Sequence, residues 1–253
     1  FENLVVNADG VLFITWLDKR DLFAAKAAQQ PYSGSAIYYA YSLDQGVSFA
    51  PTQKIADSTC ECCRIAMDTT KSGLPVILWR HIFDNGSRDH AASVFKANDT
   101  PGPVVRISSD EWPVEACPHH GPALSIDEAG VQHITWFTMG DARQGAFYAR
   151  STDGGQTFGN ILPVGNNDNQ SEHPFTLTHG GKTYVAWKEF NGENSVLKII
   201  TSLDQGVNWG EPKTLLQATD ASDHPLLLAD ASGVYASWWG AAEGWRMVAV
   251  EDR

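Results

Sequence analysis

The stretch Gly181-Lys-Thr-Tyr-Val-Ala-Trp187, followed by Ser202-Leu-Asp204-Gln-Gly206-Val-Asn-Trp209, decides the fold because both of its parts recur along the chain. The first part is a glycine followed six residues later by a tryptophan, and it occurs at Gly10/Trp16, Gly73/Trp79, Gly130/Trp136, Gly181/Trp187 and Gly233/Trp239. The residues between are rich in β-branched and aromatic types, as in a strand that follows a turn. Repetition every 51 to 63 residues predicts an array of similar β units.

The second part is a turn motif, S-x-D-x-G-x-x-[FW], found at Ser42–Phe49, Ser151–Phe158 and Ser202–Trp209. A short Asp side chain accepts hydrogen bonds from turn N–H groups, and glycine supplies the positive φ. These three turns match the Asp box, and the chain resembles the sialidase-like (BNR) β-propeller superfamily. The resemblance implies an all-β propeller of four-stranded blades, with structural roles for three aspartates. They are Asp44, Asp153 and Asp204.

The repeat also predicts the number and spacing of the blades. Five blades account for the five glycine–tryptophan copies, and six is the alternative if a degenerate blade lies at one end. The first blade carries an insertion at 19–34, the second has a decayed turn at 98–102, and the box of the fifth would begin near position 254. Because no linker-like run divides the chain, we expect a single propeller domain over residues 1–253.

The amino-acid composition limits the classes of ligand that the chain is expected to bind. The 253-residue chain has a net charge of −12 and a pI near 5.0, which disfavours nucleic acid and anionic membrane surfaces as ligands. No apolar run is long enough for a membrane span. We expect an exported protein, periplasmic or extracellular, that binds a metal ion, a small molecule or a glycan.

The order of the strands within each blade predicts which face of the propeller carries the candidate functional residues. In a blade of four antiparallel strands, the turn after the first strand and the Asp-box turn share one face, and the crossings between blades share the other. All four cysteines lie on such crossings, and so do four histidines. We therefore expect eight side chains to converge where the crossings reach the innermost strands: Cys60, Cys62, Cys63, Cys117, His119, His120, His173 and His224.

Thiolates and imidazoles together make a soft site, which predicts copper, with zinc as second choice. The alternative is a disulfide framework, since four cysteines in an exported protein form up to two bridges. Cys60-Glu-Cys62-Cys63-Arg64 contains C-x-x-C, but Arg64 stands where haem attachment needs a histidine. A redox pair there lacks the strand-to-helix context of thioredoxin-like proteins.

The sialidase resemblance implies a second class of function, a glycan-active hydrolase with an altered site. Sialidases use three arginines, a tyrosine nucleophile and an acidic residue. Cys63-Arg64-Ile65 retains part of their first arginine motif, but no tyrosine falls on an innermost strand. The catalytic residues stay unassigned. A non-catalytic binding or scaffold propeller is the third alternative. Side chains expected around the metal or a bound ligand are Arg64, Arg80, His81, Arg88, Asp89, His90 and Arg143.

Overall fold

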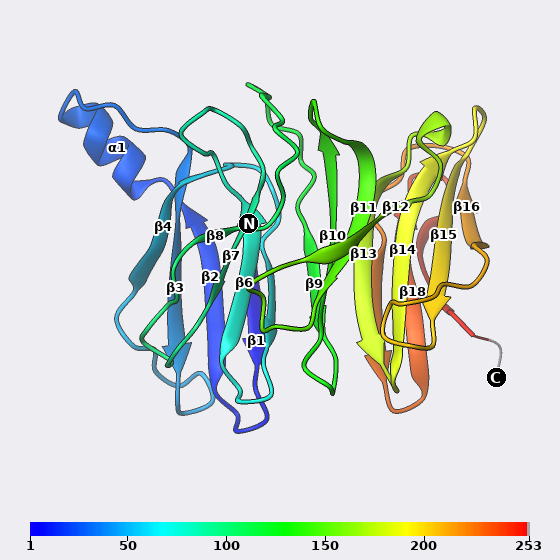
Figure 1. Ribbon diagram of the computed structural model, residues 1–253, viewed down its shortest axis with the longest axis horizontal. Helices are drawn as coiled ribbons and strands as arrows, with labels where there is room; N and C mark the ends of the chain where they lie inside the picture. The colour runs from blue at the N-terminus through cyan, green and yellow to red at the C-terminus, as the bar shows by residue number, and fades with distance from the viewer. Residues whose placement is uncertain (252–253) are drawn as a thin grey trace. The chain divides into compact units, whose positions relative to one another are not determined.

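The structure is a computed structural model that describes residues 1–251, with all of their side chains except that of Asn160. The chain divides into two compact units (Figure 1). The first unit comprises 1–122 and 139–143, and the second comprises 123–138 and 144–253. Among the described residues, no helix has the length and apolar character needed to cross a membrane.

The first unit holds two antiparallel sheets of four strands each, and both follow the order of the chain. One sheet consists of β1 (Glu2–Val6), β2 (Leu12–Asp18), β3 (Ser35–Ser42) and β4 (Gln53–Thr59). The other consists of β5 (Ala66–Thr69), β6 (Pro75–Arg80), β7 (His90–Val94) and β8 (Val105–Arg106). Helix α1 (Arg20–Ala27) falls inside the insertion and buries none of its residues, in keeping with its place at one end of its sheet in Figure 1.

The second unit holds three antiparallel sheets. The first is β9 (Ala123–Ile126), β10 (Gln132–Met139), β11 (Gln144–Ser151) and β12 (Gly159–Val164). The second is β13 (Glu172–His179), β14 (Lys182–Phe190), β15 (Ser195–Ser202) and β16 (Lys213–Ala218), preceded by the short 3-10 helix η1 (Asn167–Asn169). The third has three strands, β17 (Leu226–Asp230), β18 (Gly233–Gly240) and β19 (Gly244–Ala249).

The all-β class and the four-stranded antiparallel units agree with the sequence prediction. Five sheets of three or four strands are present in the described residues, while the number of blades stays a prediction. The glycine–tryptophan motif marks the second strand of each sheet. In three sheets its tryptophan is a buried core residue, at Trp79, Trp136 and Trp187.

The fifth copy of the motif has a different register from the one that the glycine spacing predicts. Trp238 is buried at 1% exposure, whereas Trp239 is 45% exposed. Both sheets have a two-residue turn, since Asp230 pairs with Gly233 as His179 pairs with Lys182, so Trp238 occupies the place of Trp187. The motif glycine differs by one position, because Gly181 lies in its turn whereas Gly233 begins β18. A shift of one residue moves a strand side chain to the opposite face of its sheet.

The three predicted Asp-box turns share one hydrogen-bond pattern. Ser151 Oγ donates to Asp153 at 2.7 Å and accepts from the N–H of Gly155, whose φ is +87°. Asp153 also accepts from the N–H and hydroxyl of Thr157. These hydrogen bonds hold the pKa of Asp153 below its usual value. Asp44 and Asp204 make equivalent contacts, and their pKa values are lowered to about 2, so all three carboxylates stabilise turns.

Candidate functional site

Three thiols meet inside the first unit, in the segment between β4 and β5. Cys60, Cys62 and Cys63 are 1%, 7% and 2% exposed, and their sulfurs all lie within 4.8 Å of one another. The Sγ atoms of Cys60 and Cys62 are 3.8 Å apart, and those of Cys60 and Cys63 are 3.3 Å apart. All four cysteines are free thiols, so the predicted disulfides are absent from the described residues. Metal–sulfur bonds of about 2.3 Å put the sulfurs of a tetrahedral site about 3.8 Å apart, close to this spacing.

Backbone pairing fixes the position of the cluster. The N–H of Cys60 donates to the carbonyl of Arg80 at 2.9 Å, and the N–H of Ile82 donates to the carbonyl of Ser58 at 2.7 Å. These bonds join the end of β4 to the end of β6. The chain then turns at 61–63 before β5 begins. The C-x-C-C spacing therefore brings three side chains to the same side of a tight turn whose start is held by two sheets.

Hydrogen bonds within the cluster shift the pKa values of its three thiols in different directions. Cys63 donates to Cys60 and to Cys62, which lowers the pKa of both acceptors and raises that of Cys63. Arg88 Nη1 lies 3.6 Å from the Cys60 sulfur. Lys19, which forms an ion pair with Glu61, adds a positive charge near Cys62. Cationic groups near sulfur favour thiolate, the form that binds metal.

Cys117 lies on a second segment of the first unit. Interaction with Cys62 raises the pKa of the Cys117 thiol, but its sulfur is not among the three that lie within 4.8 Å of one another. His119 has a φ of +58°, in the left-handed region that few non-glycine residues adopt. Unlike the other three cysteines, Cys117 is exposed. The convergence of the two cysteine segments on one site therefore stays a prediction.

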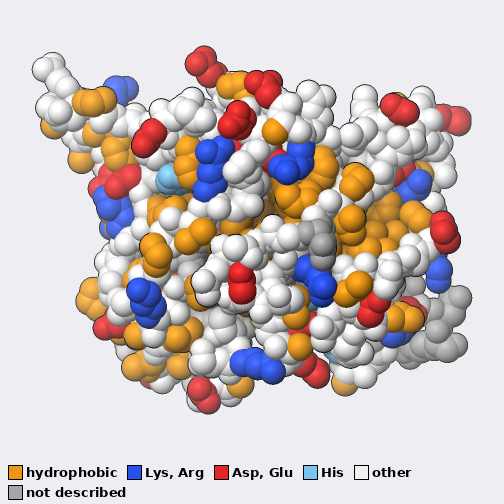
Figure 2. Space-filling view, in the orientation of Figure 1, with side chains coloured by type: hydrophobic (Ala, Val, Ile, Leu, Met, Phe, Trp, Pro, Cys, Tyr) orange, Lys and Arg blue, Asp and Glu red, His pale blue; other side chains and the backbone are white. Residues whose placement is uncertain are grey.

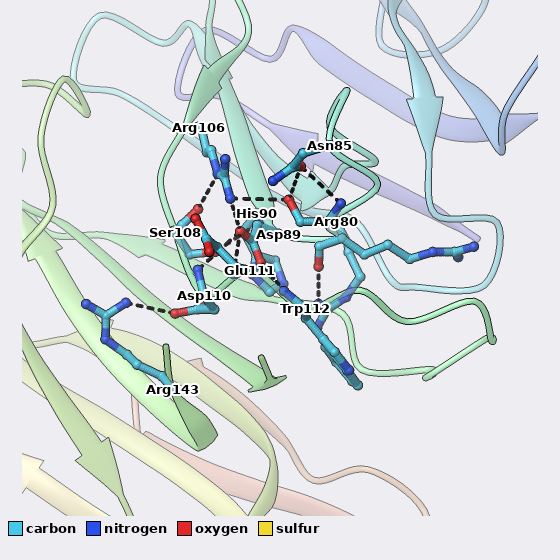
Figure 3. Close-up of polar contacts among 12 residues, drawn as sticks. Arg80, Asn85, Asp89, His90, Arg106, Ser108, Asp110, Glu111, Trp112 and Arg143 are labelled. Atoms are coloured by element: carbon cyan, nitrogen blue, oxygen red, sulfur yellow. Dashed lines mark hydrogen bonds and ion pairs between the residues drawn. The ribbon is translucent and has the colours of Figure 1, made fainter. Parts of the chain in front are cut away.

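A buried carboxylate anchors the segment that carries Cys117. Asp89, whose side chain has 0% exposure, accepts the backbone N–H groups of Asp110, Glu111 and Trp112 at 3.1, 3.0 and 3.4 Å. It also forms an ion pair with Arg106. Figure 3 shows Asp89 at the centre of these contacts. The basic partner of Asp89 is thus Arg106, and not the adjacent Arg88.

Asp110 fixes the next turn of the same segment. Its side chain is fully buried and accepts a hydrogen bond from Arg143 Nη1 at 2.8 Å, drawn as a dashed line in Figure 3. The carbonyl of Asp110 accepts the N–H of Ala142 at 3.1 Å. A Cβ on Gly140 would lie 2.0 Å from that carbonyl oxygen, so the two segments pack without room for a side chain.

Arg80 and Arg64 support this segment near its other end. Arg80 is 1% exposed and donates to the carbonyls of Arg88 at 2.6 Å and His120 at 3.0 Å. Its guanidinium lies 4.8 Å from the ring centre of Trp112. A Cβ on Gly121 would lie 2.5 Å from the backbone N and O atoms of Arg64. The segment is thus held on both sides of Cys117.

The two histidines of the β6–β7 region contact neighbouring side chains that belong to the fold. His90 is 1% exposed, with Nδ1 3.3 Å from Ser108 Oγ, and burial lowers its pKa well below the usual value. His81 lies edge-on to Phe83 and accepts a hydrogen bond from the Trp79 indole at 3.3 Å, and burial lowers its pKa too. Both histidines are therefore neutral near pH 7, which suits packing in the core.

The second unit holds the remaining predicted histidines as a pair. The rings of His173 and His224 have centres 3.8 Å apart with planes tilted by 39°. His173 is 7% exposed and has a φ of +50°, at a bulge near the start of β13. The two predicted histidines of the second unit therefore lie together as a ring pair.

Three residues that matter to the site were missed by sequence reasoning: Arg106, Asp110 and Trp112. They lie in or just after β8, where no repeat motif marks them. The only signal for this segment is its length. The stretch from the end of β8 to the start of β9 has more residues than the crossings before β13 and β17. Figure 2 shows basic side chains interspersed with acidic ones on the face it presents, without a continuous basic surface.

Comparisons with known proteins place the fold. No family model matches the chain, and no curated protein matches its sequence. A protein of unknown function from Dyadobacter fermentans superposes with a TM-score of 0.66 and 12% identity, over 99% of this chain and 78% of that one. An α-L-arabinanase from Penicillium chrysogenum has a TM-score of 0.64 and 11% identity, over 98% and 77%. A sialidase from Streptococcus pneumoniae has a TM-score of 0.57 and 9% identity, over 94% and 55%.

The similar structures of known activity are β-propeller enzymes that act on glycans, which agrees with the sialidase-like fold that the turns predict. The chain spans a little over half of the length of the sialidases. At 9 to 14% identity the likeness concerns the fold, since one fold hosts many functions.

Proposed function

We propose that the chain binds one soft metal ion through the thiols of Cys60, Cys62 and Cys63, with Cys117 beside them. The observation that carries the proposal is the burial of three free thiols within 4.8 Å of one another. Sulfur ligands select Cu(I), zinc or iron–sulfur clusters over calcium and magnesium. Copper is the first choice because three thiolates can already satisfy Cu(I), and zinc is the second because it prefers four ligands.

The thiol cluster favours this role over a purely structural one. The three buried cysteines form a cluster of their own, separate from the larger clusters of aromatic and aliphatic side chains. Bringing thiolates together without a cation is costly because like charges repel. Arg88 and Lys19 supply only partial compensation, as Arg88 is 3.6 Å from one sulfur and Lys19 is paired with Glu61. A bound cation would balance the remaining charge.

Metal titration of the reduced protein tests the proposal. We expect one equivalent of Cu(I) per chain in competition with a chelator, with sulfur-to-copper charge-transfer absorption in the ultraviolet. The Cys62→Ser/Cys63→Ser variant should lose this binding, while a Ser171→Ala variant, changed at a crossing of the second unit, should keep it. Circular dichroism of both variants checks folding. Oxidation of all four cysteines without metal, or unchanged binding by the double variant, would contradict the proposal.

A second candidate function is activity on a glycan, which the similar sialidases, arabinanase and ulvan lyase favour. In this chain Arg64 retains part of the sialidase arginine motif. We expect an active enzyme to cleave a fluorogenic sialoside or arabinoside, and Arg64→Ala to abolish turnover while Cys62→Ser/Cys63→Ser keeps it. Absence of turnover across a panel of neutral and anionic glycans would set this candidate aside.

A further inference from the structure

Two of the three clustered thiols lie close enough for a covalent bond to form after a small movement. The Sγ atoms of Cys60 and Cys63 are 3.3 Å apart, against 3.8 Å for those of Cys60 and Cys62. Bringing the sulfurs of Cys60 and Cys63 to bonding distance requires a shift of roughly 1.3 Å. Their C-x-x-C spacing also closes a larger ring than the adjacent pair Cys62 and Cys63 would. Cys60 and Cys63 are therefore the pair with the best geometry for a bond.

The backbone on the Cys63 side of the pair can supply that movement. Cys60 is fixed, since its N–H donates to the carbonyl of Arg80 at 2.9 Å. Cys63, by contrast, belongs to the turn at 61–63, between the end of β4 and the start of β5. Segments outside a strand ladder rearrange at a lower free-energy cost than the strands themselves. Movement of Cys63 towards Cys60 therefore leaves the pairing of the strands intact.

The surroundings of Cys60 favour its sulfur as the nucleophile of the pair. Arg88 Nη1 lies 3.6 Å from the Cys60 sulfur, and Cys63 donates a hydrogen bond to the same sulfur. Both contacts stabilise negative charge on sulfur, the form that attacks an oxidant. Cys60 and Cys63 are only 1% and 2% exposed, so the oxidant must be small. Hydrogen peroxide meets this requirement, whereas a peptide disulfide does not.

We infer that Cys60 and Cys63 are a site of reversible oxidation, which a small hydroperoxide converts into a buried disulfide. The Cys60 sulfur attacks one oxygen of hydrogen peroxide, the O–O bond breaks, and the other oxygen leaves as water with the Cys60 thiol proton. The sulfur of Cys63 then attacks the sulfenic acid on Cys60, the S–O bond breaks, and a second water leaves with the Cys63 proton. Two electrons pass from the sulfurs to the peroxide, and Cys62 keeps its thiol.

This oxidation has a consequence for the metal site. Cys60 and Cys63 are two of the three thiols proposed to hold the ion, and a disulfide sulfur no longer provides a thiolate ligand. The consequence rests on the proposed function, whereas formation of the disulfide requires no metal. Peroxide should therefore release a bound metal ion, and a dithiol reductant should restore the site.

Peroxide treatment of the reduced, metal-free protein tests the inference. We expect a mass loss of about 2 Da, a fall by two in the thiol count of the unfolded protein, and a peptide map that links Cys60 to Cys63. Dithiothreitol should reverse all three changes. Oxidised glutathione should instead modify the exposed Cys117 and leave the cluster reduced. A disulfide through Cys62 or Cys117, or no disulfide in excess peroxide, would overturn the inference.

Two double variants test which sulfur attacks the peroxide. In Cys62→Ser/Cys63→Ser, Cys60 has no neighbouring thiol to condense with, so dimedone should trap its sulfenic acid. In the matched variant Cys60→Ser/Cys62→Ser, the sulfur that Arg88 contacts is gone, so labelling of Cys63 should be at least about tenfold weaker. Circular dichroism checks the folding of both variants. Equal labelling would contradict the role given to Cys60.

Metal uptake separates this inference from the proposed function. Zinc is the suitable probe, because it undergoes no redox reaction with peroxide. Zinc binding should fall from about one equivalent per chain to none after oxidation, and return after reduction and removal of the reductant. A protein that binds zinc but forms no Cys60–Cys63 disulfide refutes the inference alone. A protein that forms the disulfide but binds neither zinc nor Cu(I) when reduced refutes the proposed function alone.

Discussion

The two units use the same strand repeat and differ in the segments between their sheets. In the second unit the tryptophan and the following Asp-box serine are regularly spaced, from Trp136 to Ser151 and from Trp187 to Ser202. In the first unit one sheet has the α1 insertion and the other has lost the box. The four cysteines all belong to this irregular unit. Regular repeats maintain the fold, whereas departures from the repeat mark the segments that are free to take on a function.

Each unit has a buried carboxylate that organises a crossing between two sheets. Asp89 holds residues 110–112 in the first unit, while Glu189 accepts from the Trp187 indole, from Ser171 Oγ and from the N–H of Asn166 in the second. Their basic partners, Arg106 and Lys198, are each 28% exposed. The two networks are therefore similar in the burial of their carboxylates and in the exposure of their basic partners.

The largest expected effect comes from removing these carboxylates. Asp89→Ala and Glu189→Ala should each destabilise their own unit by about 3–5 kcal/mol, because each leaves a charged partner and several N–H groups unpaired. Denaturant unfolding and hydrogen exchange resolved by unit would measure this loss. Only Asp89→Ala should also weaken metal binding, since it releases the segment that carries Cys117. Equal metal binding by both variants would contradict the anchoring role of Asp89.

A smaller difference is expected between equivalent turn glycines. Gly46 and Gly206 both have positive φ, at +89° and +78°. A Cβ on Gly206 would lie 1.9 Å from the hydroxyl of buried Tyr148, whereas on Gly46 the nearest atom is a methyl of Leu12 at 3.5 Å. Gly46→Ala should cost about 1–2 kcal/mol from backbone strain alone. Gly206→Ala should cost about 1–3 kcal/mol more from overpacking.

Thermal and denaturant unfolding of the two glycine variants would measure this difference. The hydrogen bond of 2.7 Å between Tyr148 and His133 should be disturbed only by Gly206→Ala, which hydrogen exchange in β10 and β11 would report. Equal destabilisation by the two substitutions would show that the tyrosine yields easily and that the second unit is less rigid than its packing indicates.

The smallest effect concerns pH and the buried histidines. Burial lowers the pKa of His90 in the first unit and of His133 in the second, where Asp127 partly opposes the shift. Below the unfolded pKa of about 6.5, the unfolded chain binds protons that the folded chain does not, so stability falls as pH decreases. Each histidine contributes a slope of up to about 1.4 kcal/mol per pH unit, until pH reaches its folded pKa.

Unfolding free energies from pH 7.5 to 5 for the original protein, His90→Gln and His133→Gln would isolate the two slopes. Each variant should show a shallower decline than the original, and the His90 contribution should extend to lower pH than that of His133. Unchanged slopes would mean that these histidines titrate in the folded protein near their usual pKa.

Much of the fold could be predicted from particular residues. The glycine–tryptophan spacing located the second strand of each sheet. The S-x-D-x-G motif predicted the turns whose hydrogen bonds the structure contains. Both features depend on contacts between residues that are close in sequence. The error at Trp238 and Trp239 came from Gly233, which begins its strand whereas Gly181 lies in its turn, so counting from the glycine passes the buried tryptophan by one residue. Prediction of the site was partial for a similar reason. C-x-C-C lies within one turn, whereas the roles of Arg106 and Asp110 depend on contacts with Asp89 and Arg143 that are distant in sequence.

The sequence by itself determined the strand units, the turns that close them and the clustering of Cys60, Cys62 and Cys63, since local geometry leaves few alternatives for these residues. Only the tertiary structure decided which thiol is exposed, which carboxylate holds the segment beside it, and how the predicted ligands divide between the two units. Those features depend on which side chains become buried together. Burial is a property of packing between segments, and a repeat motif does not encode it.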